Sequence, residues 1–118
     1  PCRKRSGECD LPFADGVEAQ AYGAAIGEAL PSLLDRFKPE LVLYNAGVDP
    51  HRDDRLGRLC LSDLGLLQRD HLVFDACLRL QIPVASVIGG GYDALAPLVK
   101  RHALVFRAAT DQARLHGL

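Results

Sequence analysis

The stretch VLYNAGVDPHRDDRLGRLCLS, Val42 to Ser62, begins as an apolar run and continues into a loop that is dense in charge. A second stretch, VASVIGGGYDAL (residues 84–95), repeats this order with an apolar run, three glycines and Tyr92. Both runs are short and lie between proline and glycine, which is typical of strands buried on both faces. Polar groups that follow two such strands indicate a single site.

Helical periodicity precedes the first strand. The segment DGVEAQAYGAAIGEALPSLLDRF (residues 15–37) carries apolar residues at helical spacing, and Asp15 is the expected N-cap. Pro31 falls well inside this pattern. We therefore expect a kink or break near Leu30, with Pro31 opening a second short helix.

Two further helices are predicted. Ser62 should cap a helix over DLGLLQRDHLVFDACLRLQ (residues 63–81), and another helix should run from about residue 94 to 107 with Pro97 in its first turn. The tail TDQARLHGL (residues 110–118) has a weaker pattern and is expected to be a frayed helix.

The order helix–strand–helix–strand–helix predicts an α/β fold with a parallel sheet and right-handed crossovers, in a three-layer α/β/α arrangement. The chain should form one unit over residues 1–118, with an arm or loop at 1–14, a folded part at 15–109 and the tail. Ligands of such sheets bind beyond the carboxyl ends of the strands. Two strands are fewer than the usual four to six, so either another copy or a missing part should complete the sheet.

Composition narrows the class of protein. The chain is 48% hydrophobic and 25% charged with a net charge of −1, which gives no general attraction to nucleic acid or to an acidic membrane surface. No apolar run approaches the roughly 18 residues of a membrane span, and the N-terminus lacks a signal-peptide core. Cys60 and Cys77 lie among aliphatic residues, so we expect reduced, buried thiols in a cytoplasmic protein, while Cys2 and Cys9 offer a metal or disulfide alternative. The chain begins with Pro1 and has no methionine, which suggests that it was processed or cut from something longer.

The charged loop offers candidate metal ligands. A carboxylate at the end of a strand, such as Asp49, can ligate a cation, although an aspartate before proline also serves as a turn residue. Asp49 and His51 are spaced like an Asp-x-His ligand pair, but zinc usually requires three protein ligands. Asp53, Asp54 and Arg55 fit a solvated or ion-paired loop better than a catalytic one.

The glycine triplet, residues 89–91, permits positive φ and close approach of the backbone to a ligand. It is a weak phosphate-binding signal, and a nucleotide-binding reading rests on it alone. Tyr92 could cover the strand end with its ring or donate a hydrogen bond to a developing oxyanion. The other histidines fall on predicted helices or the tail and are expected at the surface or an interface: His71, His102 and His116.

Together, YNAGVDPHRDDRLGRLCLSDLGLLQRD and VIGGGYD closely resemble the C-terminal part of the histone deacetylase family over residues 11–108. Members are zinc-dependent amidohydrolases of the arginase–deacetylase α/β fold, and this sequence is most similar to the short bacterial members. The resemblance implies that Asp49 is one zinc ligand and that Tyr92 polarises the acyl carbonyl and stabilises the oxyanion. Supporting roles follow for five residues: Gly90 and Gly91 would line the acyl-lysine channel, Asp54 and Gly57 would shape the loop, and His51 would lie at the rim.

The family's His-His dyad and strand-borne Asp-x-His pair are absent from this sequence. The resemblance therefore implies the C-terminal part of an enzyme that deacylates acyl-lysine or a similar acylated amine. We expect the isolated chain to be inactive and to bind zinc weakly or not at all. The expected partners are the missing N-terminal part and further copies in a homo-oligomer. The alternative is a non-catalytic oligomerising or binding module.

Overall fold

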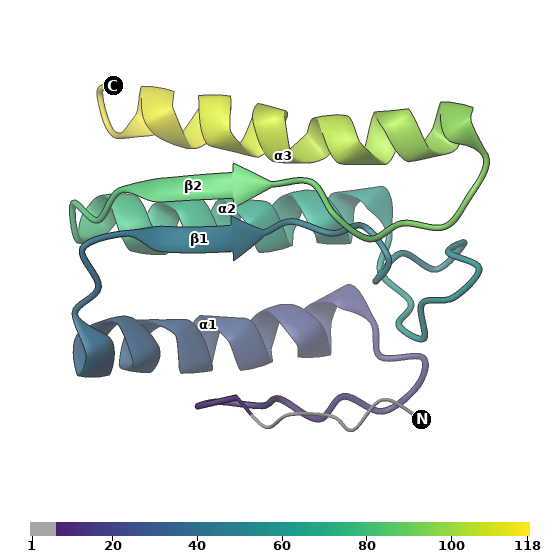
Figure 1. Ribbon diagram of the computed structural model, residues 1–118, viewed down its shortest axis with the longest axis horizontal. Coiled ribbons are helices and arrows are strands. Elements are labelled where there is room, and N and C mark those ends of the chain that lie inside the picture. The colour runs from purple at the N-terminus through teal and green to yellow at the C-terminus, as the bar shows by residue number, and fades with distance from the viewer. Residues whose placement is uncertain (1–6) are drawn as a thin grey trace.

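Two strands and three helices alternate along residues 7–118, the part of the chain that the computed structural model describes (Figure 1). Their bounds are α1 (Ala19–Phe37), β1 (Val42–Asn45), α2 (Asp63–Arg79), β2 (Val84–Val87) and α3 (Leu95–Leu115). The predicted order is confirmed, and so is the α/β class, because β1 and β2 pair in parallel with Val42 opposite Val84 and Asn45 opposite Val87. Within residues 7–118 no helix has the length and apolar character that a membrane span needs.

One face of the sheet is covered and the other is open. Figure 1 shows α2 behind the two strands, with α1 and α3 on either side. Tyr44 and Val84 point into a core that contains Phe74 of α2 and Val105 of α3. On the opposite face Leu43 is 78% exposed, because no element of residues 7–118 covers it. The expectation that both faces of the strands are buried is therefore wrong for these residues, which supply one helical layer and not two.

α1 runs from Ala19 to Phe37 without a break at Pro31, so the predicted break and second short helix are wrong. A proline inside a helix removes one backbone hydrogen bond and costs about 3 kcal/mol. Packing opposes this cost, since residues of α1 and α2 line shared hollows both before and after the proline. Gly23 approaches Leu72 in the first half, and Leu34 is 5% exposed in the second.

The two predicted helix caps have different outcomes. Ser62 caps α2 as expected, since its Oγ accepts a hydrogen bond from the Gly65 N–H at 3.1 Å. Asp15 does not cap α1, which begins later, with Glu18 in the cap position and no side-chain hydrogen bond there. The Asp15 carboxylate instead lies 3.7 Å from the Arg58 guanidinium.

The tail expected to fray forms the end of α3, which extends to Leu115. Its packing on α2 explains the difference. Gln112 is only 6% exposed, and the His116 ring lies 3.1 Å from Asp75 of α2. Folded structure thus continues past residue 109, where the sequence pattern alone weakens.

The described cysteines are free thiols: Cys77 is buried, as predicted, Cys60 is partly buried and Cys9 is exposed. Cys2 and the first six residues of the predicted arm lie outside the described part of the chain. Residues 7–14 contain neither helix nor strand, in agreement with a loop.

Candidate functional site

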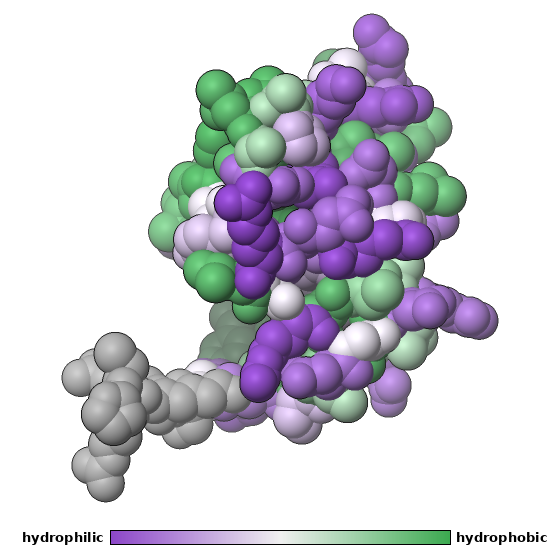
Figure 2. All heavy atoms as spheres, turned by 90° about the vertical axis from the view of Figure 1, so that its right-hand side faces the viewer, coloured by the Kyte–Doolittle hydropathy of each residue, from purple (hydrophilic) through white to green (hydrophobic). Residues whose placement is uncertain are grey.

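The two sequence motifs meet at the carboxyl ends of the strands. Beyond the last strand pair the Ala46 N–H still donates to the Val87 carbonyl at 2.9 Å, so the segments after β1 and β2 leave the sheet side by side. A Cβ on Gly47 would collide with the Gly89 carbonyl oxygen, which shows how closely the two backbones approach. Figure 2 views this end of the molecule, where hydrophilic side chains gather across the centre of the face.

Asp49 lies against the glycine triplet. A Cβ on Gly90 would collide with Asp49 Oδ1 and lie 2.9 Å from its Cγ, and a Cβ on Gly47 would lie 2.7 Å from Oδ1. Gly90 also has φ +67°, a conformation that favours glycine. Within residues 7–118 the Asp49 carboxylate has no hydrogen bond or ion pair in the folded chain. Two glycines therefore make room for a partly exposed carboxylate whose oxygens are free to bind a ligand.

Asp54 organises the loop between β1 and α2. Its Oδ1 accepts hydrogen bonds from the Gly57 N–H at 2.7 Å and the Leu56 N–H at 2.9 Å. Gly57 is needed in turn, because a Cβ there would collide with the Asp49 carbonyl oxygen. In this arrangement the two residues hold the loop against the backbone of Asp49.

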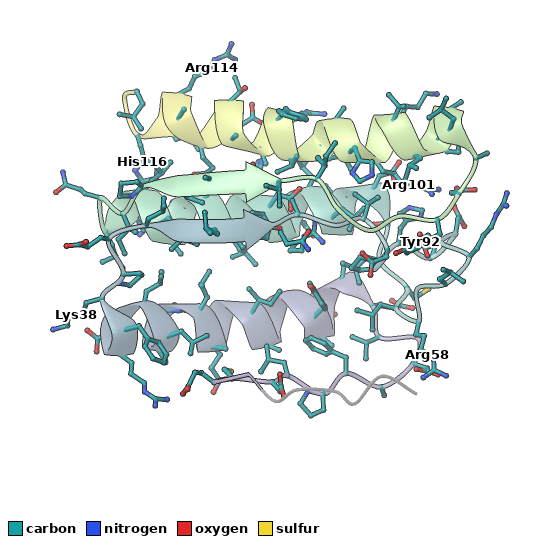
Figure 3. All side chains as sticks on the ribbon, viewed as in Figure 1. Lys38, Arg58, Tyr92, Arg101, Arg114 and His116 are labelled. Atoms are coloured by element: carbon teal, nitrogen blue, oxygen red, sulfur yellow. The ribbon has the colours of Figure 1, made fainter. Side chains whose placement is uncertain are left out.

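The same loop holds the backbone of Tyr92. Asp54 Oδ2 accepts from the Tyr92 N–H at 2.6 Å, and the Arg55 N–H donates to the Tyr92 carbonyl at 3.1 Å. Burial by itself raises the pKa of Asp54, but the backbone N–H groups of Tyr92, Gly57 and Leu56 together bring that pKa below its ordinary value. Tyr92 is 50% exposed at the strand ends, and Figure 3 shows Arg101 at the same end of the molecule.

His51 is not a rim residue in this structure, since it is only 5% exposed. Its Nδ1 accepts from the Asp53 N–H at 3.1 Å, and its Nε2 lies 3.1 Å from Asp63 Oδ1. These contacts fit the neutral ring with its proton on Nε2. Burial, and then the positive charge of Arg101, lower the pKa of His51, while Asp63 and Asp53 oppose them. His51 thus fixes the loop from inside and does not pair with Asp49 as a ligand.

A buried ion pair supports β1 from α2, and the sequence analysis missed it. Arg69 Nη1 donates to the Gly47 carbonyl at 2.7 Å, and Arg69 Nε donates to Asp70 Oδ1 at 2.9 Å. The Tyr44 hydroxyl donates to the same carboxylate oxygen at 2.5 Å. Burial raises the pKa of Tyr44 well above its ordinary value, so the hydroxyl stays protonated as this donor. The available signal was a charged Arg-Asp dipeptide within the buried stripe of α2.

The number of ligand side chains at the site decides whether it could hold zinc. Zinc sites take at least three protein ligands from His, Cys, Asp and Glu. Among residues 7–118 no group of three such side chains comes together. Asp49 fits as one ligand, because its carboxylate has no hydrogen bond or ion pair within residues 7–118 and the neighbouring glycines leave space around it. The described residues therefore contain one carboxylate that fits as a ligand, and they do not contain a complete three-ligand zinc site.

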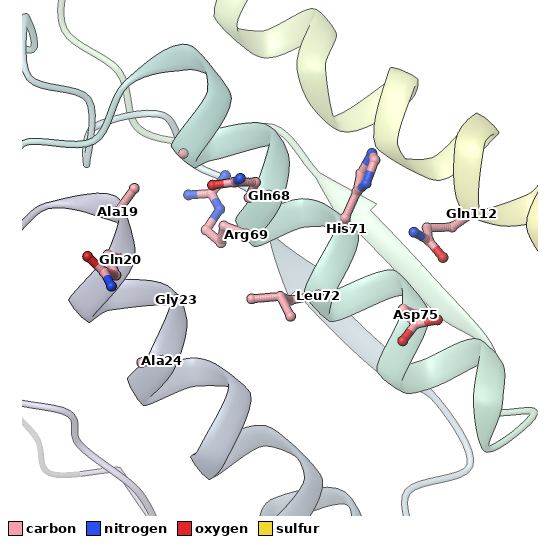
Figure 4. Close-up of a pocket in the computed structure, with 11 residues that line it drawn as sticks. Ala19, Gln20, Gly23, Ala24, Gln68, Arg69, His71, Leu72, Asp75 and Gln112 are labelled. Carbon is pink, nitrogen blue, oxygen red and sulfur yellow. The ribbon is translucent and has the colours of Figure 1, made fainter.

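A pocket of about 450 Å³ lies between α1, α2 and α3 (Figure 4). It is lined by small residues of α1, by Arg69, His71 and Asp75 of α2, and by Gln112 of α3. None of the residues at the strand ends lines it. Neither Asp49 nor Tyr92 lines the pocket, although Arg69 in its wall donates to the Gly47 carbonyl at the strand ends.

Known proteins resemble this chain in sequence. The family model described as the histone deacetylase domain matches residues 3–108. An uncharacterized protein of Picosynechococcus sp. is 44% identical over 112 residues, which are 94% of this chain and 37% of that protein. Histone deacetylase 2 of Arabidopsis thaliana is 39% identical over 77 residues, which are 65% of this chain and 20% of that protein.

A solved structure agrees with these sequence matches. The acetylpolyamine aminohydrolase from Burkholderia pseudomallei superimposes with a TM-score of 0.73 at 25% identity, over 87% of this chain and 28% of that chain. The chain thus spans well under half the length of the proteins that it matches. By its sequence match and its fold, the chain belongs to the histone deacetylase family.

Proposed function

We propose that this chain is the C-terminal part of a zinc-dependent amidohydrolase that removes acyl groups from acyl-lysine or a similar acylated amine. The observation that carries the proposal is the convergence of Asp49 and the Tyr92 loop at one edge of the sheet. Gly47 and Gly90 leave space there around the Asp49 carboxylate, which has no hydrogen bond or ion pair within residues 7–118. Family membership points to the same chemistry.

In this proposal each residue has a defined task. Asp49 supplies one of three zinc ligands, and Gly90 and Gly91 line the narrow channel for the acylated side chain. The Tyr92 hydroxyl donates a hydrogen bond to the carbonyl oxygen as negative charge develops on it. A zinc ion held in part by Asp49 would supply the Lewis acidity that activates the attacking water and polarises the carbonyl. Asp54 keeps Tyr92 in place through its backbone N–H.

We further propose that the chain on its own is inactive and retains little or no zinc, because Asp49 is a single ligand. Assays of the isolated chain and of a chimera test both statements. In the chimera, this chain replaces the matching segment of the Picosynechococcus protein. The chimera, the isolated chain and the unmodified Picosynechococcus protein are all assayed on acetyl-lysine peptides and acetylated polyamines. We expect zinc-dependent deacetylation by the chimera and none by the isolated chain.

Variants locate the chemistry. Tyr92→Phe should reduce kcat of the chimera by about 10²–10³-fold, the usual effect of losing one oxyanion donor. Asp49→Asn should abolish stoichiometric zinc in metal analysis, while Asp75→Asn, at the far end of α2, serves as the matched control. Full activity of Tyr92→Phe, or stoichiometric Asp49-dependent zinc in the isolated chain, would contradict the proposal.

The open face of the sheet supports the proposed partners. Leu43, Val87 and Ile88 are more than half exposed on or beside it. Apolar surface of this kind marks an interface. We propose that the N-terminal part of the domain covers it in the enzyme, and that copies of the isolated chain associate through it. Light scattering should then find a dimer or larger species, and a strict monomer at high concentration would count against this.

The same surface favours the alternative function, a non-catalytic binding or oligomerising module. The chimera separates the two, since a module predicts no Tyr92-dependent hydrolysis in any context. For the cell we propose a cytoplasmic location, in keeping with the free thiols of Cys60 and Cys77. Fractionation with an antibody to the chain tests this location.

A further inference from the structure

Arg101 is a buried charge at the edge of the candidate site. It lies near the start of α3 and is 6% exposed. A guanidinium is costly to bury unless carboxylates pair with it. Three carboxylates do so: Nη1 donates to Asp93 at 2.6 Å, Nη2 donates to Asp53 at 3.0 Å, and Nε lies 3.7 Å from Asp63. We call these four residues the Arg101 clamp.

The clamp joins segments that are far apart in the sequence. Asp53 belongs to the loop after β1, Asp63 to the first turn of α2, and Asp93 to the glycine-rich turn after β2. The planar guanidinium presents its N–H groups in a fixed fork, so it sets the spacing of the carboxylates that it binds. A lysine at the same position would keep the charge and lose this spacing.

Two carboxylates of the Arg101 clamp are direct sequence neighbours of Tyr92 and of the residue that binds its backbone. Asp93 follows Tyr92 in the chain, and Asp53 precedes Asp54, whose carboxylate accepts the Tyr92 N–H. Arg101 therefore joins the loop after β1 to the glycine-rich turn after β2. Asp54 and Arg55 join the same two segments through the backbone of Tyr92. The Arg101–Asp93 pair is the more buried of the two main links, since the Asp93 side chain is 16% exposed and the Asp53 side chain 62%.

We infer that Arg101 is a positioning residue for Tyr92, fixing the glycine-rich turn against the loop after β1 so that the tyrosine hydroxyl reaches the substrate carbonyl. The role of the hydroxyl rests on the proposed deacetylase function; the clamp itself rests on geometry alone. His51 completes the arrangement, because its ring contacts Asp63 and accepts the Asp53 N–H. Arg101 itself is assigned no contact with substrate.

Amide hydrogen exchange, measured by NMR on the chain as it stands, tests the clamp without catalysis. The probes are the Tyr92 N–H, bound to Asp54, and the Arg55 N–H, bound to the Tyr92 carbonyl. The reference is the Val42 N–H, which donates to the Pro83 carbonyl at 2.9 Å at the start of the sheet. Because these loop amides report local opening, they can change while the reference stays constant.

Three variants of the Arg101 clamp and one control variant are compared with wild type. Arg101→Lys and Asp93→Asn should each accelerate exchange of the Tyr92 and Arg55 amides by about tenfold or more, with the Val42 amide constant within about twofold. Asp53→Asn should have a smaller effect, since its link is the more exposed one. Asp75→Asn is the matched control, because it loses two ion pairs at the opposite end of α2 and should leave both probes unchanged.

The inference is overturned if Arg101→Lys and Asp93→Asn leave the two probe amides unchanged. It is also overturned if all amides accelerate together, since that result means a merely structural ion pair. In the chimera, Arg101→Lys should lower kcat with KM nearly constant, and it should add little to Tyr92→Phe. If the probe amides respond but Tyr92→Phe stays active, the deacetylase proposal fails and the clamp stands; the reverse pattern removes only the clamp.

Discussion

Gly90 gives a quantitative test of how the site is packed. Replacing it by alanine places a side chain at φ +67°, and a non-glycine residue in the left-handed region costs about 1–2 kcal/mol. The new Cβ also collides with the Asp49 carboxylate, and overpacking of this kind costs about 1–3 kcal/mol. Gly90→Ala should therefore lower the free energy of unfolding by about 2–5 kcal/mol, the sum of the two effects.

Gly16 is the matched control. Its φ is +80°, but a Cβ there meets nothing within 4 Å, so Gly16→Ala carries the backbone cost alone, about 1–2 kcal/mol. Urea unfolding followed by circular dichroism measures both variants, with the m-value checked for constancy. Each variant is read at one protein concentration, because association shifts apparent stability.

A double-mutant cycle isolates the collision. In an Asp49→Ala background the carboxylate is gone, so Gly90→Ala should cost about as much as Gly16→Ala. The coupling between Gly90 and Asp49 should then equal the collision energy, about 1–3 kcal/mol. Equal costs for Gly90→Ala and Gly16→Ala in the wild-type background, or a coupling near zero, would mean that the Asp49 side chain rotates away freely, and would refute its confinement by the glycine turn.

Three further predictions follow from the packing. The pKa of His51 in the folded chain is lowered from its ordinary value of 6.5, so the unfolded chain binds the proton first as the pH falls. Below about pH 6.5 the free energy of unfolding should therefore decrease by up to about 1.4 kcal/mol per pH unit. Thermal melts of His51→Gln should show a shallower pH dependence. Arg69→Met strands the buried Asp70 carboxylate and should cost about 3–5 kcal/mol in urea unfolding, whereas Arg69→Met with Asp70→Leu should cost much less. Pro31→Ala restores a hydrogen bond inside the continuous α1 and should raise the melting temperature; destabilisation would contradict the unbroken helix.

Local signals were sufficient for most of the fold. Apolar runs bounded by proline and glycine located both strands, and helical spacing located all three helices. Ser62 was identified as a cap because a hydroxyl before an apolar helix accepts the free N–H groups of the first turn. The same local rules failed at Pro31 and in the tail after residue 109. Contacts with α2 decide both places, and no local pattern contains them.

The candidate site divides in the same way. Asp49, Gly90 and Tyr92 could be found from the sequence, since the carboxyl ends of parallel strands meet at one edge and the motif identifies the residues. The supporting charges could not. Arg69 and Arg101 lie on helices, where a charged residue is ordinarily solvent-facing, and His51 looked like a loop residue at a rim.

The sequence by itself determined the type and order of the elements, the end of the sheet at which the candidate site lies and the family to which the chain belongs. What only the tertiary structure decided is which charges are buried and with which partners. Arg101 meets Asp53 across 48 positions and Asp93 across eight, and Arg69 meets the Gly47 carbonyl across 22. The desolvation of a charge depends on all the elements that surround it, and these come together only when the chain folds.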